Sequence, residues 1–296
     1  MHLNGLEPDM NPDELSVSDL ARLSTAQRAE LDEWIPGATV IADHSWGQTE
    51  SYVLEVEHGG ERLVVKAGGP TNHHIGRELD AHDGWTSIWT AGGVATRVRH
   101  ASRTHRIFVT DWMPGHLIDK MPAAVDPNVH RRAGELLRSF HDQASRVGDE
   151  RLVERVQRAL ASEHRIAPQT VARVDSLLEG LAPGAVELVP THGDWQPRNW
   201  LIDHGEFRVI DFGRFAFRSR ASDLVRLDAQ QWRVAPDCER AFFEGYGDDP
   251  RRGSEGHWLA LRTLEAVGTA AWAYQVGDEE FEAQGHRMIA NLLGED

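Results

Sequence analysis

The sequence contains a single cysteine, Cys238, among its 296 residues. One thiol can form neither a disulfide within the chain nor a cysteine-based zinc site. The sequence also lacks any run of about eighteen apolar residues, which is the length that a membrane-spanning helix needs. Acidic residues and prolines occupy the N-terminal stretch, where a signal peptide would carry an apolar segment. We therefore expect a cytoplasmic protein that has no membrane partner.

Lysine is almost absent as well. Of the 31 lysine and arginine residues, only Lys66 and Lys120 are lysines. Lys66 follows the apolar run Leu63–Val65, and this run predicts a strand. A compact ammonium group serves some sites that the planar guanidinium of arginine does not. A lysine in a chain so rich in arginine therefore indicates a site that needs an ammonium group, with a surface lysine at a strand end as the plain alternative.

Acidic residues outnumber lysine and arginine, so the formal net charge is −16. This balance argues against nucleic acid or an anionic membrane as a partner, since their phosphates need a basic face. It suits a cationic small-molecule substrate, although acidity can also serve solubility alone. The 16 histidines show no His-Glu-x-x-His or zinc-finger spacing, so we expect no transition-metal site.

Two short segments carry the pattern that predicts the chemistry. In His192-Gly193-Asp194-Trp195-Gln196-Pro197-Arg198-Asn199, an acid is followed five positions later by an amide, and Asp211-Phe212-Gly213 begins twelve residues after that amide. In kinases, the first acid orients the hydroxyl nucleophile, while the amide oxygen and the second acid hold magnesium on the ATP phosphates. The spacing predicts phosphoryl transfer that depends on ATP and Mg2+.

The context of these segments agrees with that interpretation. Residues 200–202 and 207–210 read as short strands, and the turn Asp203-His204-Gly205-Glu206 joins them. A motif counts only when its expected structural context is present. The alternative is a plain hairpin whose turn residues are polar for structural reasons.

Earlier in the chain, the pattern predicts a small antiparallel sheet. Strands are expected over 39–42, 52–57, 62–67, 94–100 and 106–110, after a capping-box helix at 24–35. The connection 43–51 lies where a kinase folds its phosphate loop, but it holds one glycine, and Ser45 is its candidate ATP contact. A helix over 74–90 carries Glu78, the expected partner of Lys66.

Residues 111–115, Asp111-Trp112-Met113-Pro114-Gly115, predict a hinge between two lobes. There the backbone groups of Asp111 and Met113 are the candidate adenine contacts. We expect an N-terminal extension and helix over 1–38, an N-lobe over 39–115 and a C-lobe over 116–296. Within the last of these, 117–125 reads as a linker, and helices are expected over 126–148, 150–164, 168–180, 224–232, 238–246 and 258–275.

Together these motifs resemble the aminoglycoside phosphotransferase family of protein-kinase-like small-molecule kinases. The resemblance spans roughly 39–246 and rests on Val65-Lys66, Arg77-Glu78, Met113-Pro114-Gly115, the segment 192–199, Ile210-Asp211-Phe212-Gly213-Arg214, Ser222-Asp223 and Phe242-Phe243-Glu244-Gly245-Tyr246. It implies an α+β, bilobal, protein-kinase-like fold with a small antiparallel-sheet N-lobe and a larger, mainly helical C-lobe.

Residue by residue, the resemblance implies that Asp194 is the catalytic base and that Asn199 and Asp211 are the magnesium ligands. Lys66 is the implied contact to the α- and β-phosphates. His192 and Asp223 are expected to brace the catalytic loop, residues 192–199. Gln196 stands where relatives often carry a histidine and protein kinases a lysine, so Arg198 or Arg214 is expected to supply positive charge near the transferred phosphate.

The leading functional hypothesis is ATP-dependent phosphorylation of a hydroxyl group on a cationic antibiotic, such as an aminoglycoside or a basic peptide, which confers resistance by inactivation. Its candidate acceptor contacts are the acids Asp237, Glu239, Glu244, Asp248 and Asp249, each of which is otherwise a solvated surface residue. The rival is a metabolic kinase of the same family that acts on choline, homoserine or a sugar-like alcohol. A non-catalytic pseudokinase and a protein kinase are the remaining alternatives, the latter disfavoured because Gly193 replaces the Arg of His-Arg-Asp.

Overall fold

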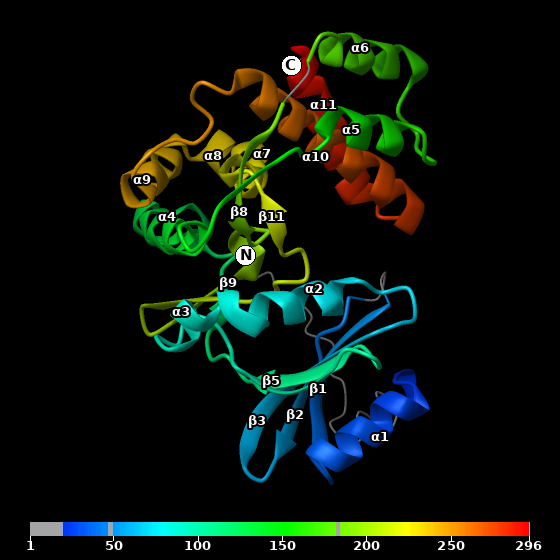
Figure 1. Cartoon of the computed structure of the whole chain (residues 1–296), viewed down its shortest axis with the longest axis vertical. Coiled ribbons are helices and arrows are strands. Elements are labelled where there is room, and N and C mark those ends of the chain that lie inside the picture. The colour runs from blue at the N-terminus through cyan, green and yellow to red at the C-terminus, as the bar shows by residue number, and fades with distance from the viewer. Residues whose placement is uncertain (1–19, 47–49, 182–183, 296) are drawn as a thin grey trace, which may run out of the picture. The chain divides into compact units, whose positions relative to one another are not determined.

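The chain folds into two compact units, Met1–Pro114 and Gly115–Asp296. The computed structural model describes residues 20–46, 50–181 and 184–295. Among these residues, the first unit is built on an antiparallel sheet and the second is mainly helical, as expected (Figure 1). None of the helices in the described ranges combines the length and the hydropathy that a membrane span needs.

The sheet of the first unit has five antiparallel strands in the order β1-β2-β3-β5-β4. Its strands are β1 (Thr39–Asp43), β2 (Ser51–His58), β3 (Glu61–Gly68), β4 (Val98–Ser102) and β5 (Ile107–Asp111). The five predicted strands are confirmed, with ends that differ by a few residues. Because β3 lies in the middle of the sheet, Lys66 has strand neighbours on both sides, Val53 on β2 and Phe108 on β5.

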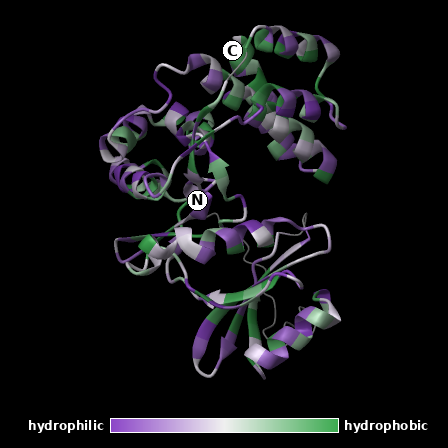
Figure 2. Cartoon of the chain, viewed as in Figure 1, coloured by the Kyte–Doolittle hydropathy of each residue, from purple (hydrophilic) through white to green (hydrophobic). Residues whose placement is uncertain are grey.

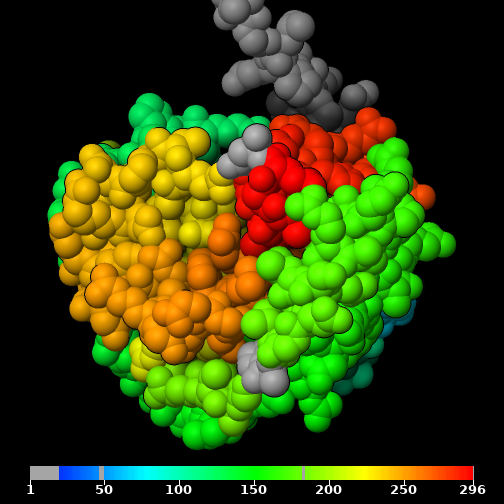
Figure 3. Space-filling model, turned by 90° about the horizontal axis from the view of Figure 1, so that it is seen from above, coloured from blue at the N-terminus to red at the C-terminus, as the bar shows by residue number. Residues whose placement is uncertain are grey.

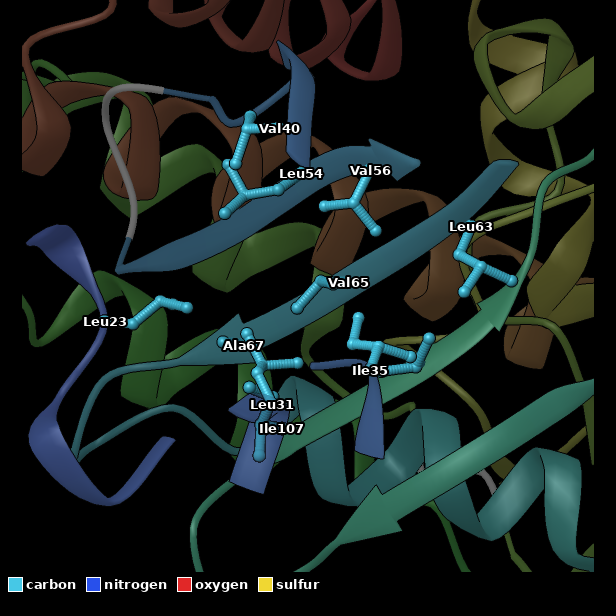
Figure 4. Close-up of a cluster of buried hydrophobic side chains, with 11 residues drawn as sticks. Leu23, Leu31, Ile35, Val40, Leu54, Val56, Leu63, Val65, Ala67 and Ile107 are labelled. Carbon is cyan, nitrogen blue, oxygen red and sulfur yellow. The ribbon is translucent and has the colours of Figure 1, made fainter. Parts of the chain in front are cut away.

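Helix α1 (Thr25–Trp34) covers one face of this sheet. Its capping box is present, because Ser24 accepts the backbone N–H of Gln27 while the Gln27 side chain accepts the N–H of Ser24. Figure 2 shows hydrophobic and hydrophilic residues interleaved along the helix. The buried apolar core shared by helix and sheet is drawn in Figure 4 and consists of Leu23, Leu31, Ile35, Val40, Leu54, Val56, Leu63, Val65, Ala67, Ile107 and Val109. The helix therefore belongs to the core of the first unit.

The single helix predicted over 74–90 is wrong. The chain forms α2 (His74–Asp80), a π-helical segment at Ala81–Trp85 and a short α3 (Ser87–Thr90). Gly84 leaves helical geometry, with φ 179° and ψ −36°. Glycine is a poor helix former, and the Ser87 hydroxyl donates to the Gly84 carbonyl at 2.7 Å, which stabilises the break.

His82, in this π-helical segment, gives the first unit a pH-dependent stability. Burial, with a smaller effect of Lys66, lowers the pKa of His82 to about 4. The unfolded chain binds this proton from pH 6.5 downward while the folded chain resists it, so stability is lost as the pH falls from 6.5 to 4. We expect His82→Gln to remove at most about 3 kcal/mol of this loss, measured by urea unfolding between pH 7 and pH 4. The exposed His116→Gln is the control and should follow the wild-type profile.

The second unit combines eight helices with two small sheets among its described residues. The sheets have the strand orders β10-β9-β6 and β11-β8-β7. The elements are β6 (His116–Leu117), α4 (Pro127–His141), β7 (Arg146–Gly148), α5 (Leu152–Leu160), α6 (Pro168–Leu178), β8 (Val186–Thr191), β9 (Trp200–Asp203), β10 (Glu206–Val209), β11 (Ala216–Arg218), α7 (Val225–Ala229), α8 (Gln231–Val234), α9 (Pro236–Tyr246), α10 (Glu255–Val276) and α11 (Glu279–Leu293).

A long apolar core in this unit forms around α10. Figure 3 shows the orange and red surface of α10 and α11 against the green surface of α5 and α6. The buried residues of this cluster are Val156, Ile166, Val174, Leu178, Ala266, Val267, Ala270 and Ile289. Small alanines on α10 let its neighbours approach, and a Cβ built at Gly285 of α11 would lie 2.4 Å from the backbone nitrogen of Ala270. Helix α10 is thus held firmly on the side that faces this core.

Three expectations for the second unit are corrected. Helix α4 ends at His141 rather than Gly148, because Arg146–Gly148 pairs instead with β8 as strand β7. Leu117, the first residue of the expected linker 117–125, forms strand β6 together with His116 and pairs with β9. Helix α11 was not predicted. For strands β6 and β7, pairing with a distant segment decides the structure, and local sequence pattern does not report such partners.

Candidate active site

The hairpin of β9 and β10 forms as predicted and positions the central residues of the motif. Trp200 pairs with Val209 and Asp203 with Glu206, so the two strands are in register across the turn at His204 and Gly205. The backbone N–H of Ile210 donates to the carbonyl of Asn199 at 3.0 Å. This bond brings the end of the catalytic loop and the start of the Asp-Phe-Gly segment to the same end of the hairpin.

Gly193 allows the catalytic loop to pass close to the following segment. Its φ is +82°, and a Cβ at this position would lie 2.2 Å from the carbonyl oxygen of Arg214. Both the backbone conformation and the contact exclude a larger residue. Strand β8, which precedes the loop, pairs with β11, with Thr191 opposite Ala216, so residues 192–194 and 214 are held side by side.

Asp194 is buried, with an exposed fraction of 3%, and both oxygens of its carboxylate accept hydrogen bonds. Oδ1 accepts from Gln196 and from Nη1 of Arg226, and Oδ2 accepts from Nη2 of Arg198 at 2.6 Å. Burial alone would raise the pKa of Asp194, but the guanidinium groups of Arg226, Arg198 and Arg214 outweigh it and hold the pKa well below its usual range. The carboxylate is therefore ionised at any ordinary pH.

Arg226 and Glu265 are the members of this cluster that sequence reasoning missed. Arg226 lies on α7, donates to Asp194 and also donates through Nε to Oε1 of Glu265 on α10 at 2.9 Å. Because Gln196 carries no positive charge, the sequence indicated that another residue supplies it near the transferred phosphate. Arg198 and Arg214 were the predicted candidates. Arg198 does contact Asp194, and Arg214 acts on it electrostatically, but the buried cation comes from a helix more than thirty residues further along the chain.

The predicted donor set for magnesium is one amide oxygen and one carboxylate. Nδ2 of Asn199 donates to the backbone carbonyl of Asp194 at 2.8 Å, which leaves Oδ1 of this buried amide as its ligand atom. Asp211 is exposed, has φ 65°, and accepts the backbone N–H of Gly213 through Oδ1 at 3.3 Å. Mg2+ prefers such hard oxygens and takes its remaining ligands from phosphates and water. The residues thus fit magnesium, whereas no group of three or more His, Cys, Asp or Glu side chains in the described ranges forms a metal cluster of its own.

Asp223 braces the catalytic loop through hydrogen bonds from the loop backbone, as expected. Its carboxylate accepts the backbone N–H groups of His192 at 2.8 Å and Gly193 at 2.6 Å. Oδ2 also faces Nε2 of His141 at 3.1 Å, with both side chains fully buried. Burial lowers the pKa of His141, and Nδ1 of its ring lies 2.7 Å from the Tyr246 hydroxyl. The loop is therefore tied to α4 and α9.

In the first unit, the pair expected from the sequence is present. Nζ of Lys66 donates to Oε1 of Glu78 on α2 at 2.7 Å, and Glu78 is buried. Lys66 lies on the central strand, so its backbone position is fixed from both sides. Its role as a phosphate contact stays a prediction.

The other candidate ATP contacts are also in the first unit. The Ser45 hydroxyl accepts the backbone N–H of Val53 at 2.9 Å, while residues 47–49 of the same loop lie outside the described residues. At the end of β5, the N–H of Asp111 donates to Arg97 and its carbonyl accepts from Thr96 at 2.7 Å. That carbonyl retains a second lone pair for a ligand. Met113 is half-buried two residues further on.

The acids expected to contact a cationic acceptor are all paired with arginine. The pairs are Asp237 with Arg240, Glu239 and Asp249 with Arg251, Glu244 with Arg131, and Asp248 with Arg138. The guanidinium of Arg251 also lies over the rings of Trp232, Phe243 and Trp258. These acids therefore do not form an uncompensated negative surface.

Comparisons with known proteins agree with this geometry. The sequence model of the phosphotransferase enzyme family matches residues 44–255. A search of curated proteins finds no match. A similar solved structure is the apo form of a thermostable mutant of the aminoglycoside phosphotransferase APH(4)-Ia, with a TM-score of 0.69 and 14% identity. The match covers 90% of this chain and 98% of that one.

Two further solved structures are similar at comparable levels. The choline kinase LicA from Streptococcus pneumoniae gives a TM-score of 0.67 at 16% identity, over 92% of this chain and 98% of that one. A choline/ethanolamine kinase family protein from Mesorhizobium loti gives 0.64 at 18%, over 86% and 88%. The expected kinase-like α+β fold is confirmed.

Proposed function

The chain belongs to the phosphotransferase enzyme family, and from that premise we propose that it transfers the γ-phosphoryl group of ATP to a hydroxyl group of a small molecule. The observation that supports this most directly is the arrangement around the β9–β10 hairpin. An ionised, buried Asp194 stands beside Asn199, and Asp211 follows at the same end of the hairpin. This is the set of groups that phosphoryl transfer requires.

In the proposed mechanism, Asp194 orients the acceptor. Its depressed pKa makes it a weak base, so it does not remove the hydroxyl proton early. It accepts a hydrogen bond from the hydroxyl and aligns the oxygen with the phosphorus, and it receives the proton as the new bond to phosphorus forms. Positioning of this kind is the main contribution that a protein makes to a loose phosphoryl-transfer transition state.

Each unit contributes its own candidate groups for the nucleotide. Lys66, fixed by Glu78, would contact the α- and β-phosphates, and Ser45 and the backbone groups of Asp111 and Met113 would contact the rest of ATP. Asn199 and Asp211 would hold Mg2+, which supplies charge neutralisation on the phosphates. Among structures of similar fold, the aminoglycoside phosphotransferase APH(4)-Ia has been solved with ADP and hygromycin B, which supports an adenine nucleotide as the donor.

For the acceptor, we propose a cationic antibiotic, an aminoglycoside or a basic peptide, with resistance by inactivation in the cytoplasm as the role. The net charge of −16 supports it, because a negative protein steers a cation toward its surface. A second candidate is a metabolic kinase for choline, homoserine or a sugar-like alcohol. The arginine partners of Asp237, Glu239, Glu244, Asp248 and Asp249 favour it, since they leave little free negative charge there. A pseudokinase is disfavoured because Lys66, Asp194, Asn199 and Asp211 are all present.

A coupled ADP-release assay with Mg-ATP tests the proposal. The acceptor panel contains aminoglycosides, basic peptide antibiotics, macrolides, choline and homoserine, and Asp194→Ala runs beside the wild type. We expect ADP release that depends on one class of acceptor and is lost in the variant. ADP release that no acceptor stimulates, in a protein that binds Mg-ATP, would contradict the proposed acceptors and point to a metabolite outside the panel or to a pseudokinase.

A further inference from the structure

The two oxygens of Asp194 have different surroundings. Oδ1 accepts two hydrogen bonds, from Arg226 and Gln196, and a carboxylate oxygen has about two positions for such bonds. Oδ2 accepts one, from Arg198, whose side chain is partly exposed at 38%. An acceptor position therefore remains at Oδ2, and Oδ1 has none.

The group that occupies Oδ1 is itself anchored. Arg226 is 8% exposed at its side chain, and its planar guanidinium uses Nη1 for Asp194 and Nε for Glu265. Glu265 lies on α10, and its neighbours Ala266 and Val267 are buried in the apolar core of α5, α6, α10 and α11. Two donors on one rigid plane thus link the catalytic carboxylate to a helix that is firmly packed.

We infer that Arg226, anchored by Glu265, is a positioning residue that holds Oδ1 of Asp194 and directs Oδ2 toward the acceptor hydroxyl. The inference rests on the proposed kinase function. It explains why position 196 needs no basic residue, because the cation that fixes the carboxylate reaches it from α7. It also explains the choice of arginine, since a lysine ammonium cannot keep the fixed angle between two carboxylates on different elements.

Loss of Arg226 or Glu265 is therefore expected to disturb the alignment of the reacting groups more than it disturbs the binding of the nucleotide. Arg226→Gly and Glu265→Ala are expected to lower kcat by about tenfold to a hundredfold, the range that a displacement of about 1 Å at a reacting group produces. The KM for ATP should stay near the wild-type value. Glu265→Gln retains an oxygen that accepts from Nε of Arg226, so it should recover most of the kcat lost in Glu265→Ala.

The closing experiment is chemical rescue. ADP release from Mg-ATP is measured for Arg226→Gly with hygromycin B, spectinomycin, choline and water as acceptors, with millimolar guanidinium or the same concentration of urea added. Guanidinium restores the missing cation, while urea has a similar shape without charge, so we expect rescue by guanidinium alone. Arg262→Gln is the control, because Arg262 lies on α10, the helix of Glu265, and pairs with Asp228 instead of Asp194.

Three results would overturn the inference. Arg226→Gly with a kcat near wild type would remove the positioning role while the kinase proposal stands. A rise in the KM for ATP together with equal rescue by urea would identify a merely structural cavity. A wild type whose ADP release does not depend on Asp194 would reject the kinase proposal and the inference together.

Discussion

Asp194→Asn is expected to lower kcat about a thousandfold, within the range that an acid or base group contributes to an enzyme reaction. The substitution keeps the size of the side chain but removes its charge. Its amide group also has one oxygen where the carboxylate has two, so Arg226, Arg198 and Gln196 can no longer all donate to it. The acceptor hydroxyl then loses the group that orients it.

This prediction separates chemistry from binding. The proposed ATP contacts remain in the variant, so Mg-ATP affinity, measured by calorimetry, should change little while steady-state ADP release collapses. Glu206→Gln is the control, since Glu206 is an exposed carboxylate on the same hairpin. A kcat within about tenfold of wild type in Asp194→Asn would contradict the role given to this residue.

Asp223→Ala is expected to lower the free energy of unfolding by about 3–5 kcal/mol, because it leaves three buried donors without an acceptor, each at a cost of roughly 1–3 kcal/mol. The backbone N–H groups of His192 and Gly193 and the ring of His141 would lose their common acceptor. Urea unfolding of the variant and the wild type measures the difference. Because the same bonds hold the catalytic loop, kcat should fall as well, even at temperatures where the variant is folded.

A neighbouring residue provides a close control for this measurement. The Ser222 hydroxyl is buried without a hydrogen-bond partner among the described residues, so Ser222→Ala removes nothing that is satisfied and should change stability by less than about 0.5 kcal/mol. Asp223→Asn keeps one accepting oxygen and should fall between the two. If Asp223→Ala proves as stable as Ser222→Ala, the loop does not depend on this carboxylate.

The parts of the fold that the sequence predicted are those with local signals. The capping box of Ser24 and Gln27, the apolar run Leu63–Val65 of β3 and the turn at His204-Gly205 are each encoded within a few residues. Strand β7 was predicted as helix because its strand character comes from pairing with β8, about forty residues further on. The break at Gly84 was missed because a single glycine does not by itself end a helix.

The same division applies to the candidate site. The motif residues were found because their spacing along the chain follows directly from one loop and one hairpin. Arg226 and Glu265 could not be found in this way, because their relation to Asp194 depends on how α7 and α10 pack in the second unit. The role of the acids in the segment 237–249 as acceptor contacts stays a prediction. The sequence did not reveal their arginine partners, which lie on α4, on α9 and in the connection after α9.

The near absence of lysine has a practical consequence for chemical labelling. Lys66 lies mid-strand with its amine bonded to Glu78, whereas Lys120 is exposed and lies beyond the sheet. These are the two lysine side chains that an acylating reagent or a lysine-specific protease can meet in the sequence. In the folded protein, cleavage or modification at Lys120 therefore reports on an open segment near the start of the second unit. Cleavage or modification at Lys66 would instead show that the sheet is no longer intact.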